Sequence, residues 1–183
     1  APPLKIARLF YTKNGLPINQ DKTWNYAAMN SLNTAPPDQV YLQPGYVTAH
    51  LNFDREPRFY ADLGFDGGTW YGHGRYDDKS PWHIEGRAGG YSGKARAQGY
   101  SITGYYAKKM VHYLTIMDND GRLVYQPYPW PIVRLADLYL YYSEALNESD
   151  DHAGEALKWI NLVRARAGIP SVQESWDNFS TNP

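Results

Sequence analysis

The side chains best suited to bind a ligand are aromatic rings gathered in one glycine-rich stretch, residues 64–101. Indole and phenol rings offer flat apolar faces and a polar edge, a combination that suits the C–H faces and hydroxyl groups of a sugar. Polar side chains are interleaved with these rings: Asp66, His73, Arg75, Asp77, Asp78 and His83. The predicted ligand-binding residues are Trp70, Tyr71, Tyr76, Trp82 and Tyr91.

Each of these rings also has a purely structural alternative. Ile84 is the only aliphatic residue larger than alanine in the stretch, so the stretch cannot form an aliphatic core of its own. The chain has 17 tyrosines, six tryptophans and five phenylalanines among 183 residues, and rings must therefore supply much of the buried apolar area. A given ring either contacts ligand or packs the loop against the rest of the protein.

Carboxylates in and beside this stretch raise the possibility of glycoside hydrolysis. That reaction needs two carboxylates roughly 5–10 Å apart across the scissile bond. The candidates are Asp62, Asp66, Asp77, Asp78 and Glu85. They form no recognisable motif, and we expect a protein that is not an enzyme.

A metal site, a cofactor site and a nucleic-acid site are not expected either. The residues His73, Asp77, Asp78 and His83 lack the spacing of a helical metal motif. The chain contains no cysteine, which excludes disulfides, thiol nucleophiles and iron–sulfur clusters. A net charge of −1 gives no bulk attraction to phosphate groups, so a charge-driven nucleic-acid partner is not predicted.

The elements that must position the rings differ along the chain. Residues 1–63 are broken by turn residues and predict loops with short pieces, of which Asn25 to Leu32 is the best candidate for a helix. Residues 64–130 predict a large irregular region. Within it, a strand over 111–116 and a return over 123–125 form a possible small β-hairpin.

Residues 131–170 carry the clearest regular signal. Apolar residues recur at spacings of three and four from Ile132 to Leu146, with Pro131 in the position where a helix begins. A second stripe runs from Ala153 to Ala167 and ends at Gly168. The two helices predict an αα-hairpin, which cannot bury both of its faces alone, and we expect its packing partners to lie outside this chain.

Four segments, in order along the chain, resemble the SusD/RagB proteins, the surface lipoproteins with which Bacteroidetes capture nutrients. Residues 131–145 are similar to the family's arginine, alanine and acid followed by an aliphatic run. Residues 160–170 resemble its helix end N-x-V-R-x-R-A-G, and residues 10–17 its F-Y-x-K-N-G segment. Residues 54–60 resemble its R-D/E-P-R-F segment, whose alternating charges we expect to fix the loop through Arg–carboxylate pairs.

The resemblance implies a mainly α, SusD-like fold of TPR-like helical repeats, with residues 1–183 as one partial domain. It further implies a non-catalytic glycan-binding protein at the outer-membrane cell surface, partnered by a SusC-like TonB-dependent transporter. Family members are several hundred residues long, so the chain is expected to be a fragment without the lipid anchor that would hold it to the membrane. Two alternatives stay open: a lid or interaction module for the transporter, and a protein that binds peptide cargo.

Overall fold

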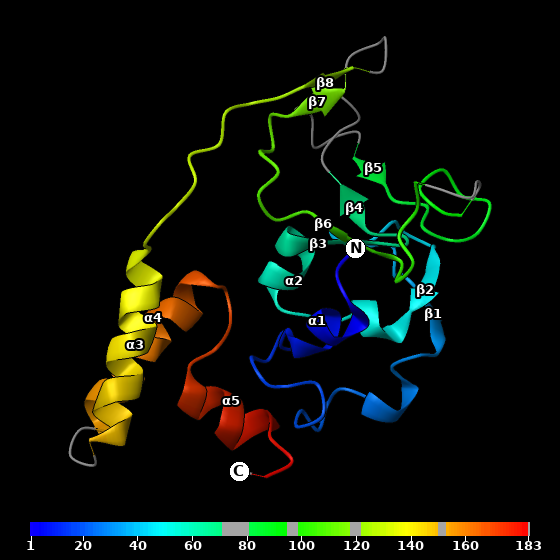
Figure 1. Cartoon of the computed structure of the whole chain (residues 1–183). Helices are drawn as coiled ribbons and strands as arrows, with labels where there is room; N and C mark the ends of the chain where they lie inside the picture. Colours follow the sequence, from blue (N-terminus) through cyan, green and yellow to red (C-terminus); the bar gives the residue numbers. More distant parts are fainter. Residues whose placement is uncertain (71–80, 95–98, 118–121, 150–152, 183) are drawn as a thin grey trace. The chain divides into compact units, whose positions relative to one another are not determined.

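The computed structural model describes residues 1–70, 81–94, 99–117, 122–149 and 153–182 (Figure 1). The chain forms two compact units, each assembled from segments that are distant in sequence. The first unit contains residues 1–9, 27–53 and 59–128, and the second contains residues 10–26, 54–58 and 129–183.

Short antiparallel pairs and short helices make up the first unit. All the named strands of the described chain pair two by two: β1 (Leu32–Thr34) with β2 (Val47–Ala49), β3 (Leu63–Phe65) with β6 (Tyr105–Ala107), β4 (Thr69–Trp70) with β5 (Trp82–His83), and β7 (Ile116–Met117) with β8 (Leu123–Val124). The helical pieces are α1 (Leu4–Leu9), η2 (His50–Asn52) and most of α2 (Pro57–Asp62). The residues of η1 (Tyr26–Ala28) are divided between the two units, with Tyr26 assigned to the second.

Aromatic rings form the core of this first unit. The ring of Phe59 lies 5.3 Å from that of Tyr60 and 5.3 Å from that of Phe65, and Phe65 lies 6.3 Å from Tyr105. All four are buried, together with aliphatic neighbours such as Ile84. Rings therefore supply the apolar area that the composition lacks in aliphatic side chains.

The second unit contains the predicted αα-hairpin. The helix α3 (Leu135–Glu148) packs along α4 (Ala153–Arg166). The two helices are antiparallel, because Tyr139 contacts Trp159 while the Ser143 hydroxyl, one turn further along α3, donates to the carbonyl of Ala156, one turn earlier on α4. The end of α4 is as predicted, because Gly168 adopts a φ of 73°. The helix α5 (Val172–Phe179) was not predicted, although Ser171 caps it by accepting a hydrogen bond from the Glu174 amide.

Three predicted boundaries are wrong. The helix expected to begin at Pro131 begins at Leu135, because Arg134 is extended and its guanidinium pairs with Asp137 in the first turn. The helix expected over residues 25–32 shrinks to the single turn η1, because Leu32 pairs with β2 instead.

The strand expected over residues 111–116 is also wrong for most of its length. The chain turns at His112, whose carbonyl accepts a hydrogen bond from the Thr115 amide and whose ring nitrogen accepts one from the Leu114 amide. Among the described residues, the short strands β7 and β8 are what remains of the expected hairpin. Residues 118–121, which join the two strands in sequence, lie outside the described residues.

Several large apolar side chains of α3 are exposed in the part of the chain that the structure describes. Leu135, Leu138, Tyr141 and Tyr142 are exposed, while Leu146 is buried. No helix in the described part of the chain combines the length and the apolar character that crossing a bilayer requires.

Candidate functional site

Three of the five predicted ligand-binding rings lie in one region of the first unit. Trp70 of β4 and Trp82 of β5 are directly opposite each other in an antiparallel pair, so their side chains leave the ladder on the same side. Both indoles are half-buried. The other two predicted rings, Tyr71 and Tyr76, lie outside the described residues.

Tyr91 extends the aromatic surface beyond the strands. Its ring stands edge-on to the indole of Trp82, with centroids 5.9 Å apart, and 73% of the residue is exposed. We call Trp70, Trp82 and Tyr91 the aromatic surface. The rings therefore present half-buried and exposed faces on one unit, whereas Phe65 of the same stretch is sealed in the core.

The loop that carries Tyr91 is closed tightly by its glycines. The Tyr91 amide donates to the Glu85 carboxylate at 3.3 Å, and the following amide donates to the Glu85 carbonyl at 3.0 Å. A Cβ on Gly90 would lie 2.5 Å from the Glu85 carbonyl oxygen, and one on Gly93 would lie 1.7 Å from that of Arg87. These glycines permit close chain crossings that a side chain would block.

The carboxylate of Asp66 also holds the loop that carries Tyr91, through bonds to Gly86 and Arg87. One of its carboxylate oxygens accepts bonds from the Tyr46 hydroxyl at 2.8 Å and the Gly86 amide at 2.7 Å, and the other pairs with Arg87 at 3.0 Å. Burial, together with the hydrogen bond to Asp66, raises the pKa of Tyr46 to about 12. The hydrogen bond from Asp66 likewise raises the pKa of Arg87. The sequence offers Asp66 both as a polar side chain beside the ligand-binding rings and as a candidate hydrolytic acid, but it points to no role for Tyr46 or Arg87.

Three of the predicted acids, Asp62, Asp66 and Glu85, are each bonded to structural partners. Asp66 is saturated by structural donors, Asp62 lies 3.7 Å from the Lys109 ammonium, and Glu85 accepts the Tyr91 amide. The candidates Asp77 and Asp78 lie outside the described residues. Burial lowers the pKa of His83, which is therefore neutral at pH 7.

No group of three or more metal-ligating side chains converges among the residues that the structure describes. Of the residues considered for a metal, His83 lies on β5, and His73, Asp77 and Asp78 belong to the segment that is not described.

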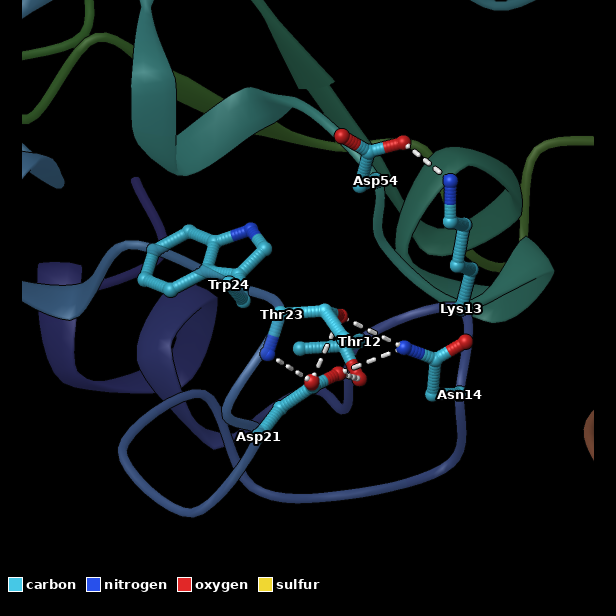
Figure 2. A pocket seen from close by; sticks show the side chains of 7 residues that line it. All are labelled: Thr12, Lys13, Asn14, Asp21, Thr23, Trp24 and Asp54. Carbon is cyan, nitrogen blue, oxygen red and sulfur yellow. Dashed lines mark hydrogen bonds and ion pairs between the residues drawn. The ribbon is translucent and has the colours of Figure 1, made fainter. Parts of the chain in front are cut away.

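A separate polar cavity of about 130 Å³ lies in the second unit (Figure 2). Asp21 is its hub: the carboxylate accepts bonds from Thr12, Asn14 and Thr23 at 2.7 to 2.9 Å. Burial alone would raise the pKa of Asp21, but these hydrogen bonds outweigh it and lower the pKa. The carboxylate is therefore already saturated by protein donors.

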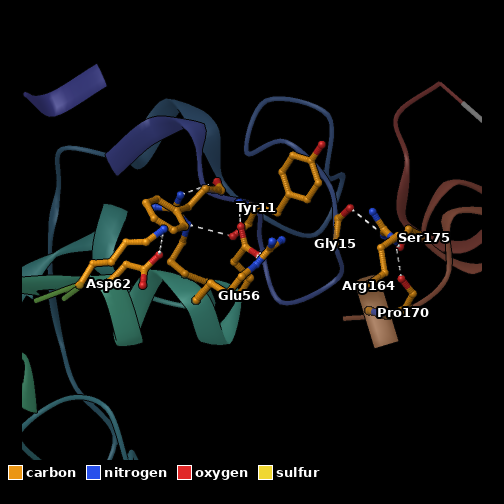
Figure 3. A network of polar contacts seen from close by, with 11 residues as sticks. Tyr11, Gly15, Glu56, Asp62, Arg164, Pro170 and Ser175 are labelled. Atoms are coloured by element: carbon orange, nitrogen blue, oxygen red, sulfur yellow. Dashed lines mark hydrogen bonds and ion pairs between the residues drawn. The ribbon is translucent and has the colours of Figure 1, made fainter. Parts of the chain in front are cut away.

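The charged segment over residues 54–58 is structural, as predicted from its alternating charges. Asp54 pairs with Lys13 at 2.9 Å (Figure 2). The Glu56 carboxylate accepts the Tyr11 amide at 2.8 Å (Figure 3) and also pairs with Arg58 at 2.8 Å. The buried Arg55 donates to backbone carbonyls of residues 10 and 11. Charged groups here fix the backbone and leave no reactive pair.

Comparison with known proteins gives consistent results. The SusD family profile matches residues 1–182. Among solved structures, the selenomethionine form of BT4246 is 29% identical with a TM-score of 0.74, and it aligns over 94% of this chain and 29% of its own length. A SusD-like protein, BF3747, from Bacteroides fragilis NCTC 9343 is 26% identical with a TM-score of 0.58, over 94% of this chain and 29% of its own. No curated protein matches the chain.

This chain thus spans less than a third of the length of the solved proteins that it matches. The match nevertheless covers almost every residue of the chain and includes the segments from which the resemblance was first inferred. The chain belongs to the SusD family.

Proposed function

We propose that this chain is part of a non-catalytic protein that binds glycans at the outer-membrane cell surface and delivers them to a SusC-like TonB-dependent transporter. Membership of a family of nutrient-binding surface proteins supports the setting and the partner. The observation that carries the proposal for this chain is the aromatic surface, in which two opposed indoles and one exposed phenol share a region of the first unit.

The chemistry of this surface favours an uncharged, hydroxyl-rich ligand. Half-buried indoles bind the apolar face of a sugar ring while their own positions stay fixed, so little entropy is lost on binding. The nearby His83 is neutral, and Asp66 and Arg87 neutralise each other at 3.0 Å. Because a delivery protein must release its cargo, we expect dissociation constants of roughly micromolar to millimolar, about −8 to −4 kcal/mol.

Calorimetry of the full-length protein against a panel of oligosaccharides tests the proposal. Trp82→Ala removes an indole from the aromatic surface and should weaken binding about tenfold, which corresponds to about 1.4 kcal/mol. Trp70→Ala should act in the same direction. Trp130→Ala is the matched control, because Trp130 is an exposed indole of the second unit, outside the proposed site. Unchanged affinity in both site variants, with folding intact, would refute the assignment.

A second candidate function rests on the uncovered face of α3. The exposed side chains Leu135, Leu138, Tyr141 and Tyr142 form an apolar face of the kind that further TPR-like hairpins or a protein partner would cover. In that case the protein acts as a transporter lid or as a binder of peptide cargo. A glycan array separates the two proposals, since a lid gives no glycan hits, and a peptide library tests the remaining cargo.

A further inference from the structure

Lys108 is a buried lysine whose ammonium contacts two other elements of the first unit, α2 and β4. It directly follows β6 and is only 8% exposed. Its ammonium donates to the Tyr60 carbonyl on α2 at 3.0 Å and to the Thr69 carbonyl on β4 at 3.0 Å. It also lies 5.7 Å from the ring centroid of Trp70, within the range of a cation–π contact.

Lysine is among the residues least often buried, so a buried ammonium calls for a reason. The two carbonyl oxygens give part of it, because a buried carbonyl without a donor is unfavourable. The position of one of those oxygens gives the second part of the reason. Thr69 immediately precedes Trp70, so the bond to its carbonyl restrains the peptide unit from which the indole projects.

We infer that Lys108 is the positioning residue of the aromatic surface: its ammonium holds β4 against α2 and fixes the orientation of the Trp70 indole. This inference rests on the proposed function, because the orientation of the Trp70 indole affects function only if the indole contacts a ligand. A fixed indole opposite Trp82 presents a preformed face to a sugar, whereas a mobile one has to be ordered when the ligand binds.

The charge of Lys108 offers a way to observe this role. Burial lowers the pKa of Lys108 to about 8, so the ammonium is charged at pH 7 and loses its charge as the pH rises through this value. The neutral amine keeps a hydrogen-bond donor but loses the attraction to the indole face. Among the described residues, the other titratable or charged groups on the elements packed against Lys108, on the adjacent β5 and next to Lys108 itself are Arg58, Tyr60, Asp62, His83, Tyr105, Tyr106 and Lys109.

Fluorescence of the full-length protein tests the positioning role without any ligand. The Trp70 signal is obtained as the difference between each protein and its Trp70→Phe counterpart. In the wild type we expect its emission and its quenching by acrylamide to change with a midpoint near pH 8. The titration should vanish in Lys108→Met and in Lys108→Arg, which stays charged, and it should persist in Lys109→Met, the matched control for an exposed neighbouring lysine.

Calorimetry with soluble hexasaccharides of glucose, xylose and mannose then links position to binding. Lys108→Met should weaken any measured affinity about tenfold at pH 7, and Lys108→Arg should recover part of it. If no hexasaccharide binds, the proposed function fails while the fluorescence still decides the positioning role. A wild-type Trp70 signal that does not titrate between pH 7 and 9.5, or that titrates equally in Lys108→Arg, overturns the inference. Wild type and Lys108→Arg suffice for this test if Lys108→Met does not fold.

Discussion

Substituting Gly64 by alanine should disturb the core and the aromatic surface together. Gly64 lies in β3, between the side chains of Ile84 and Trp70. An added Cβ would lie 2.6 Å from the Cδ1 atom of Ile84 and 2.8 Å from the Cζ3 atom of Trp70. Carbon atoms in contact are ordinarily about 3.5–4.0 Å apart, so the methyl group overlaps both neighbours by roughly 1 Å.

The expected cost follows from which neighbour can move. Ile84 is 2% exposed and has no space to yield, whereas the half-buried indole of Trp70 can shift outward. Overpacking of this kind costs about 1–3 kcal/mol of unfolding free energy. The displaced indole should also weaken binding of any hexasaccharide that the wild type binds, because Trp70 no longer lies opposite Trp82 in its original orientation.

Gly86→Ala is the matched control. Neither glycine has a positive φ, both belong to the first unit, and the nearest atom to an added Cβ on Gly86 is the Cβ of Asp66 at 3.4 Å, an ordinary contact. The entropic gain of about 0.4–1 kcal/mol from replacing glycine by alanine is shared and cancels in the comparison. Urea denaturation of the two full-length variants measures the difference, and calorimetry measures affinity. Equal stability of the two variants would show that the packing argument around Gly64 is wrong.

Two further predictions concern the second unit. Gly15→Ala should destabilise the protein by about 2–4 kcal/mol in urea denaturation, because Gly15 has a φ of 75° and a Cβ there would lie 2.3 Å from the buried Arg164 guanidinium. Gly168→Ala, with a φ of 73° but only a 3.2 Å contact, should cost about 1 kcal/mol. An equal cost for the two variants would show that the contact with Arg164 adds nothing to the backbone strain at Gly15. Because the folded-state pKa of Asp21 is lowered, its contribution to stability is present above the unfolded value, near pH 4, and is lost as the pH falls through the folded value. Asp21→Asn should therefore flatten the stability–pH curve below pH 4, and an unchanged acid limb would refute this.

The local signals in the sequence were reliable where a structure depends on near neighbours. The spacing of apolar residues over 135–148 and 153–166 indicated two helices, and Gly168 marked the end of the second. The family segments identified the family for the same reason, since each is a short run of residues. Local signals misplaced the helix start near Pro131, because the extended Arg134 pairs with the first turn and delays the helix.

The candidate site depended on contacts that no local pattern contains. Each of these contacts joins segments that are distant in sequence. Trp70 lies opposite Trp82 because of the strand register, and Lys108 bonds to the Thr69 carbonyl 39 residues away. The loop that carries Tyr91 is held by the bond from the Gly86 amide to Asp66. The sequence alone determined that rings, glycines and two amphipathic helices would be present, because these follow from residue type and spacing. Only the tertiary structure decided which rings stay accessible, because burial depends on which distant segments pack against each ring.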